Sequence, residues 1–259
     1  MSVILPGDDL GISTDQIETS IGPGIYKVPG IKDTKLIPIN GGLLNIQRNK
    51  QGTRQAAHLE SNSRRYIPQV SDMVIGTIVG VYAEYYKVLL QNFLSNVTLS
   101  VMAFPNATKK NRPNLRQGQC VYARVSSYIP DLETELECFD LSTGKDGGFG
   151  LLDESGYIFD VELNYARELL FNPGFLVLEK LSTKCMFEIA IGINGKIWLK
   201  CGDGVPIPGK STDEDSDKMD VDYVKDLKTT LAAANYIKQC QKVSPEQFDK
   251  VLAASFKGL

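Results

Sequence analysis

The sequence has 259 residues, of which 42% are apolar and 23% are charged. This composition is typical of a globular protein with room for two or three domains, and it excludes a largely disordered chain. The formal net charge of −3 argues against a free-standing nucleic-acid binder, because such proteins are usually basic overall. Any contact with RNA therefore depends on a local cationic patch or on a partner protein.

Five cysteines are present, and none of them belongs to a CxxC pair. An odd number without such pairs indicates reduced thiols of the cytosol or nucleus rather than a disulfide framework or a zinc site. The first residues have neither a cationic flank nor a long apolar run, so we expect no secretory signal. We also expect no membrane contact, since no stretch reaches the length of a membrane-spanning helix.

Residues 1–70 are predicted to form a small β domain. Four short runs of strand composition follow an initial pair of turns, and they occupy residues 25–28, 35–39, 43–47 and 55–59. A unit of this size buries little surface by itself, so we expect it to pack against a neighbouring domain or a partner. The only histidine, His58, lies in the last run and is expected to be a structural or surface residue rather than a catalytic base.

Residues 71–143 are predicted to form a five-stranded barrel of the OB type. Gly76 and Gly80 interrupt the first β-branched run, as bends or close backbone approaches require. The five runs rich in Val, Leu, Tyr and Thr are residues 73–82, 85–90, 97–102, 121–126 and 134–140. The ligand most often bound by such barrels is an oligonucleotide. Strand counting alone leaves a β-sandwich fragment as the alternative.

The densest cationic segment lies between the third and fourth of these runs. Residues 108–116 contain four cations, Lys109, Lys110, Arg112 and Arg116. Lysine and arginine at the rim of a barrel contact the phosphates of a nucleic-acid backbone. We therefore predict that these four side chains bind RNA, with an ordinary solvated loop as the alternative.

Two adjacent tyrosines, Tyr85 and Tyr86, are candidates for a platform on which bases stack. Because side chains alternate along a strand, one of the two faces the core and only the other is available to a base. The neighbouring run at residues 96–101 supplies no further aromatic side chain, which weakens the hypothesis.

Four carboxylates alternate near the end of the barrel sequence, and on a strand they project from one face, opposite buried positions that include Leu132. They are Asp131, Glu133, Glu135 and Glu137. Paired carboxylates can hold the divalent metal of a nuclease. A solvent-facing stripe is the preferred interpretation, because nothing nearby supplies a convergent third group from another element.

A glycine-rich segment at residues 144–150 is predicted to be a hinge, since it lacks the ending of a phosphate-binding loop. An α+β domain follows at residues 150–259. Asn164 is expected to cap its first short helix, and residues 210–222 have the composition of a mobile acidic loop. Two helices close the chain, and Ser244 is the expected cap of the second.

Gly192, Ile193, Asn194 and Gly195 satisfy the GXXG pattern with which KH domains clamp an RNA backbone. Both flanks alternate as strands do, and Asn-Gly between two such runs is a strong hairpin signal. We therefore predict a structural two-residue turn with a positive φ at Gly195, which pairs Ile193 with residue 196 and Ile191 with residue 198.

Three segments, residues 66–76, 102–107 and 192–195, resemble in sequence and order the cap subunits of the eukaryotic RNA exosome, of the Rrp-forty type (exosome component three). The resemblance covers most of the chain. It implies a mainly β fold with an α+β C-terminal part: a small N-terminal β domain, a five-stranded OB-type barrel and a KH-like domain.

The same resemblance implies a non-catalytic RNA-binding subunit. Such a subunit stabilises a ring of RNase PH-like subunits beside other cap subunits, and it guides single-stranded RNA to a nuclease for 3′-to-5′ processing and decay. The implied location is the nucleus and nucleolus, and also the cytoplasm.

The alternative function is a metal-dependent ribonuclease that uses Glu133, Glu135 and Glu137. We expect no cofactor, because the sequence contains no nucleophile–base pair, metal constellation or nucleotide loop. A ribosome-binding barrel of the translation-factor type would need a strongly basic surface, which this composition lacks.

Overall fold

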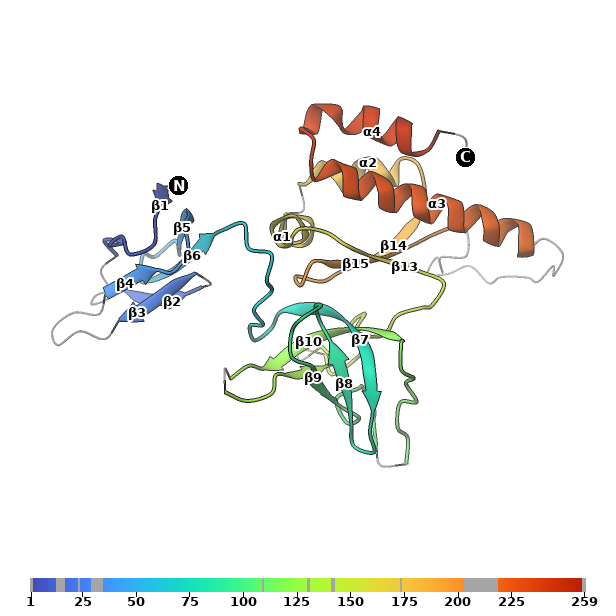
Figure 1. The fold of residues 1–259 in the computed structure, drawn as a ribbon, viewed down its shortest axis with the longest axis horizontal. Helices are drawn as coiled ribbons and strands as arrows, with labels where there is room; N and C mark the ends of the chain where they lie inside the picture. Colours follow the sequence, from blue (N-terminus) through green and yellow to red (C-terminus); the bar gives the residue numbers. More distant parts are fainter. Residues whose placement is uncertain are drawn as a thin grey trace. The chain divides into compact units, whose positions relative to one another are not determined.

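The computed structural model describes residues 2–12, 17–22, 24–28, 35–108, 110–129, 131–140, 143–172, 174–202 and 219–257, with the backbone alone for 219–223. The chain divides into two compact units, Met1–Arg64 and Arg65–Leu259, and Figure 1 shows the elements of each. The second unit contains both the barrel and the C-terminal domain. Most of the acidic segment predicted at residues 210–222 lies outside the described residues.

The first unit is built from two sheets. The larger has the strand order β1 (Ser2–Ile4), β5 (Gly42–Arg48), β6 (Arg54–Glu60) and β2 (Glu18–Ile21), and β3 (Ile25–Val28) pairs with β4 (Lys35–Pro38) in the smaller. Alternation along β6 buries every second side chain and supplies Ala57 and Leu59 to a small core. His58 points to the other side of β6, where its Nε2 lies 3.6 Å from a Glu60 carboxylate oxygen.

The barrel begins the second unit. Its strands are β7 (Met73–Val81), β8 (Tyr85–Leu89), β9 (Val97–Ser100), β10 (Cys120–Ser127) and β11 (Glu135–Glu137), with the short β12 (Gly150–Leu151) on β10. Pairing of β10 with β11 closes the barrel, so the predicted five-stranded OB-type fold is confirmed. Gly76 is required inside it, because a Cβ there would lie 2.2 Å from a methyl carbon of Val88.

Two sequence predictions in the barrel are wrong. The last strand covers residues 135–137 rather than 134–140. Leu132 does not face the core, since its side chain is 66% exposed. The residues before Glu135 form a loop, so strand alternation does not extend back to Leu132. The strand also ends at Glu137, and the N–H of Cys138 donates to the carbonyl of Ala103 instead of to a neighbouring strand.

The C-terminal domain is a three-stranded sheet covered by helices on one face (Figure 1). The strand order is β13 (Tyr157–Asp160), β15 (Lys196–Cys201), β14 (Phe187–Ile191). The helices are α1 (Leu163–Phe171), α2 (Leu176–Ser182), α3 (Met219–Cys240), the 3-10 turn η1 (Pro245–Gln247) and α4 (Phe248–Ser255). No helix in the described ranges is long and apolar enough to span a membrane.

One of the two predicted helix caps is wrong, and the other is correct in position. Asn164 lies inside the first turn of α1, whose N-cap is Glu162. Ser244 does precede the last helical segment, with Pro245 after it, but its side chain makes no capping hydrogen bond.

The two faces of this sheet have different partners. Ile197 and Leu199 of β15 pack against the helices, whereas Trp198 and Ala190 pack against Ile75 of the barrel strand β7. The indole N–H of Trp198 donates to the carbonyl of Asp153 at 3.0 Å. The C-terminal domain and the barrel therefore share a buried contact.

The hairpin between β14 and β15 has a different register from the one predicted. Ile191 pairs with Ile197, and Trp198 pairs with Ala190. The Gly192 N–H donates to the carbonyl of Lys196, and the Gly195 N–H donates back to the carbonyl of Gly192. The turn thus has three residues, with Gly195 at φ +82°, the geometry of a type I turn followed by a left-handed residue. The extra residue shifts every pair by one.

Candidate nucleic-acid interface

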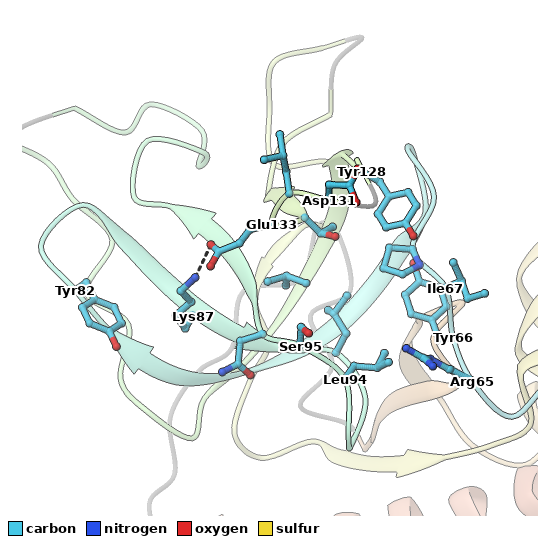
Figure 2. Close-up of a pocket in the computed structure, with 16 residues that line it drawn as sticks. Arg65, Tyr66, Ile67, Tyr82, Lys87, Leu94, Ser95, Tyr128, Asp131 and Glu133 are labelled. Atoms are coloured by element: carbon cyan, nitrogen blue, oxygen red, sulfur yellow. Dashed lines mark hydrogen bonds and ion pairs between the residues drawn. The ribbon is translucent and has the colours of Figure 1, made fainter.

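A groove with a cavity volume of about 920 Å³ runs over strands β8 and β9 of the barrel (Figure 2). Its walls come from residues 65–68, 94–97 and 131–134, and Tyr82 lies at one end. OB barrels bind oligonucleotides on this face, between the loop that joins their first two strands and the loop that joins their last two. Tyr82 and residues 131–134 belong to those two loops, so the groove is the candidate ligand site.

Lys87 and Glu133 face each other inside the groove, as Figure 2 shows. Lys87 lies on the outward face of β8, and its Nζ donates to a carboxylate oxygen of Glu133 at 2.5 Å. The hydroxyl of Thr98, on the adjacent strand β9, donates to the same oxygen at 2.6 Å. These hydrogen bonds, that of Lys87 foremost, lower the pKa of the Glu133 carboxyl. The site therefore holds a carboxylate against a cation and a hydroxyl.

The tyrosine platform consists of Tyr82 and Tyr85. Their rings stack with centroids 4.8 Å apart, and Lys87 Nζ lies 5.4 Å from the centroid of the Tyr85 ring. Tyr86 is in the core with 3% exposure, and its hydroxyl donates to the carbonyl of Pro113. Sequence reasoning missed Tyr82, which directly follows the last residue of β7. An aromatic residue at the turn between two barrel strands is the signal that could have found it.

The cationic loop is anchored beside this platform. A guanidinium nitrogen of Arg112 donates to the carbonyl of Ala83 at 2.8 Å, the residue next to Tyr82. The side chain of Lys110 is exposed, and Leu115 is buried in the barrel core. Lys109 lies outside the described residues. The structure thus brings Arg112 to the Tyr82 end of the groove.

Arg116 lies elsewhere. It lines a separate cavity of about 400 Å³ together with Gln119 and Glu154, and those two side chains are hydrogen-bonded to each other at 2.8 Å. Arg116 and Arg112 therefore lie at different sites of the barrel.

The Gly192–Gly195 loop is hydrogen-bonded to the backbone of the barrel. The side-chain amide of Asn194 donates to the carbonyls of Ile75 and Leu90 at 2.8 and 2.7 Å, and its oxygen accepts from the Ile75 N–H at 3.2 Å. Ile193 is buried in the barrel core, and its N–H donates to the carbonyl of Met73. Asn194 is only 2% exposed, so in this arrangement the loop binds barrel backbone rather than RNA.

The alternating carboxylates are held by different partners. Glu137 pairs with Arg124 of β10, a pair that is 12–14% exposed, whereas Glu133 pairs with Lys87. Glu135 is exposed between them. Within the described ranges, no three His, Cys, Asp or Glu side chains are placed to hold a metal ion. This arrangement gives no support to the ribonuclease alternative.

Three family models match successive parts of the chain. They are described as the "Exosome complex exonuclease Rrp40 N-terminal domain" at residues 19–65, the "Exosome complex component RRP40, S1 domain" at residues 66–150, and the "KH domain" at residues 156–205. The chain therefore belongs to the class of proteins that join an S1-type barrel to a KH domain.

Full-length relatives define the family within that class. The chain is 43% identical to exosome complex component RRP40 of Saccharomyces cerevisiae, over 98% of this chain and 95% of that protein. It is 32% identical to the Schizosaccharomyces pombe protein of the same name over 95% of this chain and 91% of that one. The Drosophila melanogaster protein is 29% identical over 96% and 94%. The chain belongs to the exosome component RRP40 family.

Proposed function

We propose that this chain is a non-catalytic, RNA-binding cap subunit of the exosome. It stabilises the ring of RNase PH-like subunits and guides single-stranded RNA to the nuclease for 3′-to-5′ processing and decay. Membership of the RRP40 family supports the assembly. The observation that carries RNA binding is the OB groove, which has a stacked tyrosine pair and an anchored cationic loop at the same end.

RNA binding at this end uses two kinds of contact. Lys109, Lys110 and Arg112 contact phosphates, which carry no sequence information, and the exposed ring of Tyr82 offers a stacking surface to any base. Binding is therefore indifferent to sequence and sensitive to salt. The net charge of −3 makes binding by the lone chain weak, so the assembled complex supplies the remaining contacts.

The partners are the RNase PH-like ring subunits and the other cap subunits, and the location is the nucleus and nucleolus, with a cytoplasmic fraction. We propose no catalytic role, although the family model that matches residues 19–65 is described as an exonuclease N-terminal domain. Two carboxylates of the predicted stripe have different partners, Glu133 with Lys87 and Glu137 with Arg124, so the stripe does not converge on one site.

The test is a triple variant, Lys109→Glu, Lys110→Glu and Arg112→Glu, assembled with its partners. Folding should be unchanged, because surface charges such as those of the exposed Lys110 and Arg112 contribute little to stability, whereas RNA crosslinking to the assembled complex should fall, with a loss that shrinks as salt rises. The matched control changes three exposed lysines of α3 and α4 by the same charge: Lys225, Lys228 and Lys250. An equal RNA footprint in both triple variants would contradict the assignment of RNA binding to the cationic loop. Failure of the unsubstituted chain to co-purify with exosome subunits would contradict its proposed place in the exosome.

A further inference from the structure

The contact of Glu133 with strands β8 and β9 resembles an occupied anion site. One carboxylate oxygen accepts from Lys87 Nζ at 2.5 Å and from the Thr98 hydroxyl at 2.6 Å. Lys87 Nζ also donates to the Thr98 hydroxyl at 3.2 Å, so the three groups form a closed triangle. A lysine and a threonine hydroxyl on one oxygen are also the donors that contact a backbone phosphate in nucleic-acid complexes.

The position of Lys87, Thr98 and Glu133 agrees with a ligand site rather than with contacts that only stabilise the fold. Lys87 and Thr98 are directly paired residues on the outward face of β8 and β9, and Lys87 and Glu133 line the groove near its Tyr82 end (Figure 2). The Lys87 side chain is 19% exposed, whereas that of Glu133 is 64% exposed. The carboxylate therefore covers the cation from the solvent side, where a ligand would approach.

The second carboxylate–cation pair of the barrel gives the contrast. Arg124 and Glu137 are 14% and 12% exposed, so breaking that pair would leave a charge without its partner in a poorly hydrated place. Displacing Glu133 costs much less, because its carboxylate returns to water and an exposed ion pair contributes little to stability.

We infer that Lys87 and Thr98 form a phosphate subsite of the RNA groove, which Glu133 occupies in the absence of RNA. This inference rests on the proposed RNA-binding function. A phosphodiester that enters the groove takes the place of the Glu133 carboxylate on the same two donors. Lys87 also lies beside the Tyr82–Tyr85 stack, so a phosphate here places the adjoining base next to an aromatic face. Glu133 thus sets how strongly the barrel competes for RNA.

The experiment compares Glu133→Gln with Glu135→Gln in the full chain. Both variants remove one negative charge from neighbouring exposed positions, but Glu135 makes no ion pair in the described structure. The probe is a labelled oligouridylate, and the readout is fluorescence anisotropy across a salt series. Glu133→Gln should bind about twofold to fivefold more tightly at low salt, the range that loss of an exposed ion pair corresponds to. Its log–log salt slope should also steepen relative to the unsubstituted chain, because Lys87 then meets the phosphate as a cation that no carboxylate neutralises beforehand.

A double variant separates the subsite from general electrostatics. Adding Lys87→Gln to Glu133→Gln should abolish the gain, because the cation that the phosphate reaches is then absent. Equal gains for Glu133→Gln and Glu135→Gln, or a gain that persists without Lys87, would overturn the inference.

A second measurement remains decisive if RNA binding by the lone chain is too weak to measure, an outcome that bears on the proposed function and leaves the subsite to be tested by itself. Inorganic phosphate is titrated while NMR follows the backbone amides of residues 87 and 98. The subsite predicts that these amides respond at lower phosphate concentration in Glu133→Gln than in the unsubstituted chain or in Glu135→Gln. Identical responses in all three would refute the subsite.

Discussion

Replacing Asn194 by alanine is expected to destabilise the unit formed by residues 65–259 by about 3 kcal/mol. The side chain makes three hydrogen bonds to backbone groups of Ile75 and Leu90, each contributing about 0.5–1.5 kcal/mol net. Asn194 is 2% exposed, so water does not readily replace it, and the three bonds together give a loss of about 3 kcal/mol, the middle of the summed range.

Trp198 provides the assay, because it is the only tryptophan and lies in the contact between the C-terminal sheet and the barrel. Its fluorescence reports separation or unfolding of that contact in a urea titration. With a slope of about 2–3 kcal/mol per molar urea, the loss lowers the midpoint by about 1–1.5 M. The exposed Asn92, changed to alanine, is the control and should leave the midpoint unaltered. A variant of Asn194 with an unchanged midpoint but weaker RNA binding would refute the reasoning and restore the loop as an RNA clamp.

Two further predictions concern backbone conformation and titration. Gly195→Ala should lower the stability in thermal unfolding by about 1–3 kcal/mol more than Gly118→Ala. Both glycines have positive φ, but of the two only Gly195 would place a Cβ against backbone, 2.7 Å from the Val161 carbonyl oxygen. Equal losses would show that the backbone at Val161 moves away without cost. The hydrogen bond from Lys200 lowers the pKa of Asp153 to about 2 from its ordinary value of 3.8. Between these two pH values the folded state binds fewer protons than the unfolded state. The contribution of this ion pair to folding stability is therefore complete above about pH 4 and is lost as pH falls towards 2. NMR titration should find the pKa of Asp153 near 2 and show it return towards 3.8 in Lys200→Gln; an unchanged value would contradict the ion pair.

Runs of strand composition predicted the barrel together with the family resemblance, since strand counting alone left a β-sandwich fragment open. Alternation placed Tyr85 and Tyr86 on opposite faces, because burial of a strand depends on residues two positions apart, and the structure shows that Tyr86 is the inward one. Alternation failed at Leu132, where the chain is not yet a strand.

The hairpin loop shows the limit of local patterns. Asn-Gly correctly indicated a turn, and Gly195 has the expected positive φ. The three-residue register and the role of Asn194 depend on Ile75 and Leu90, which are 119 and 104 positions away. Arg112 likewise reaches the carbonyl of Ala83, the residue after Tyr82, only because the cationic loop folds back on that turn. No local pattern encodes such pairings.

The burial of Ile193 within the barrel core has a consequence for modularity. A residue from the C-terminal domain completes the interior of the preceding one, so the barrel is not a cassette that can be cut out or exchanged by itself. Chimaeras joined in the glycine-rich segment at residues 144–150 would combine one protein's barrel with the hairpin residue of another protein at the position of Ile193. A functional exchange between related subunits must therefore carry the barrel and its hairpin together as one inherited block.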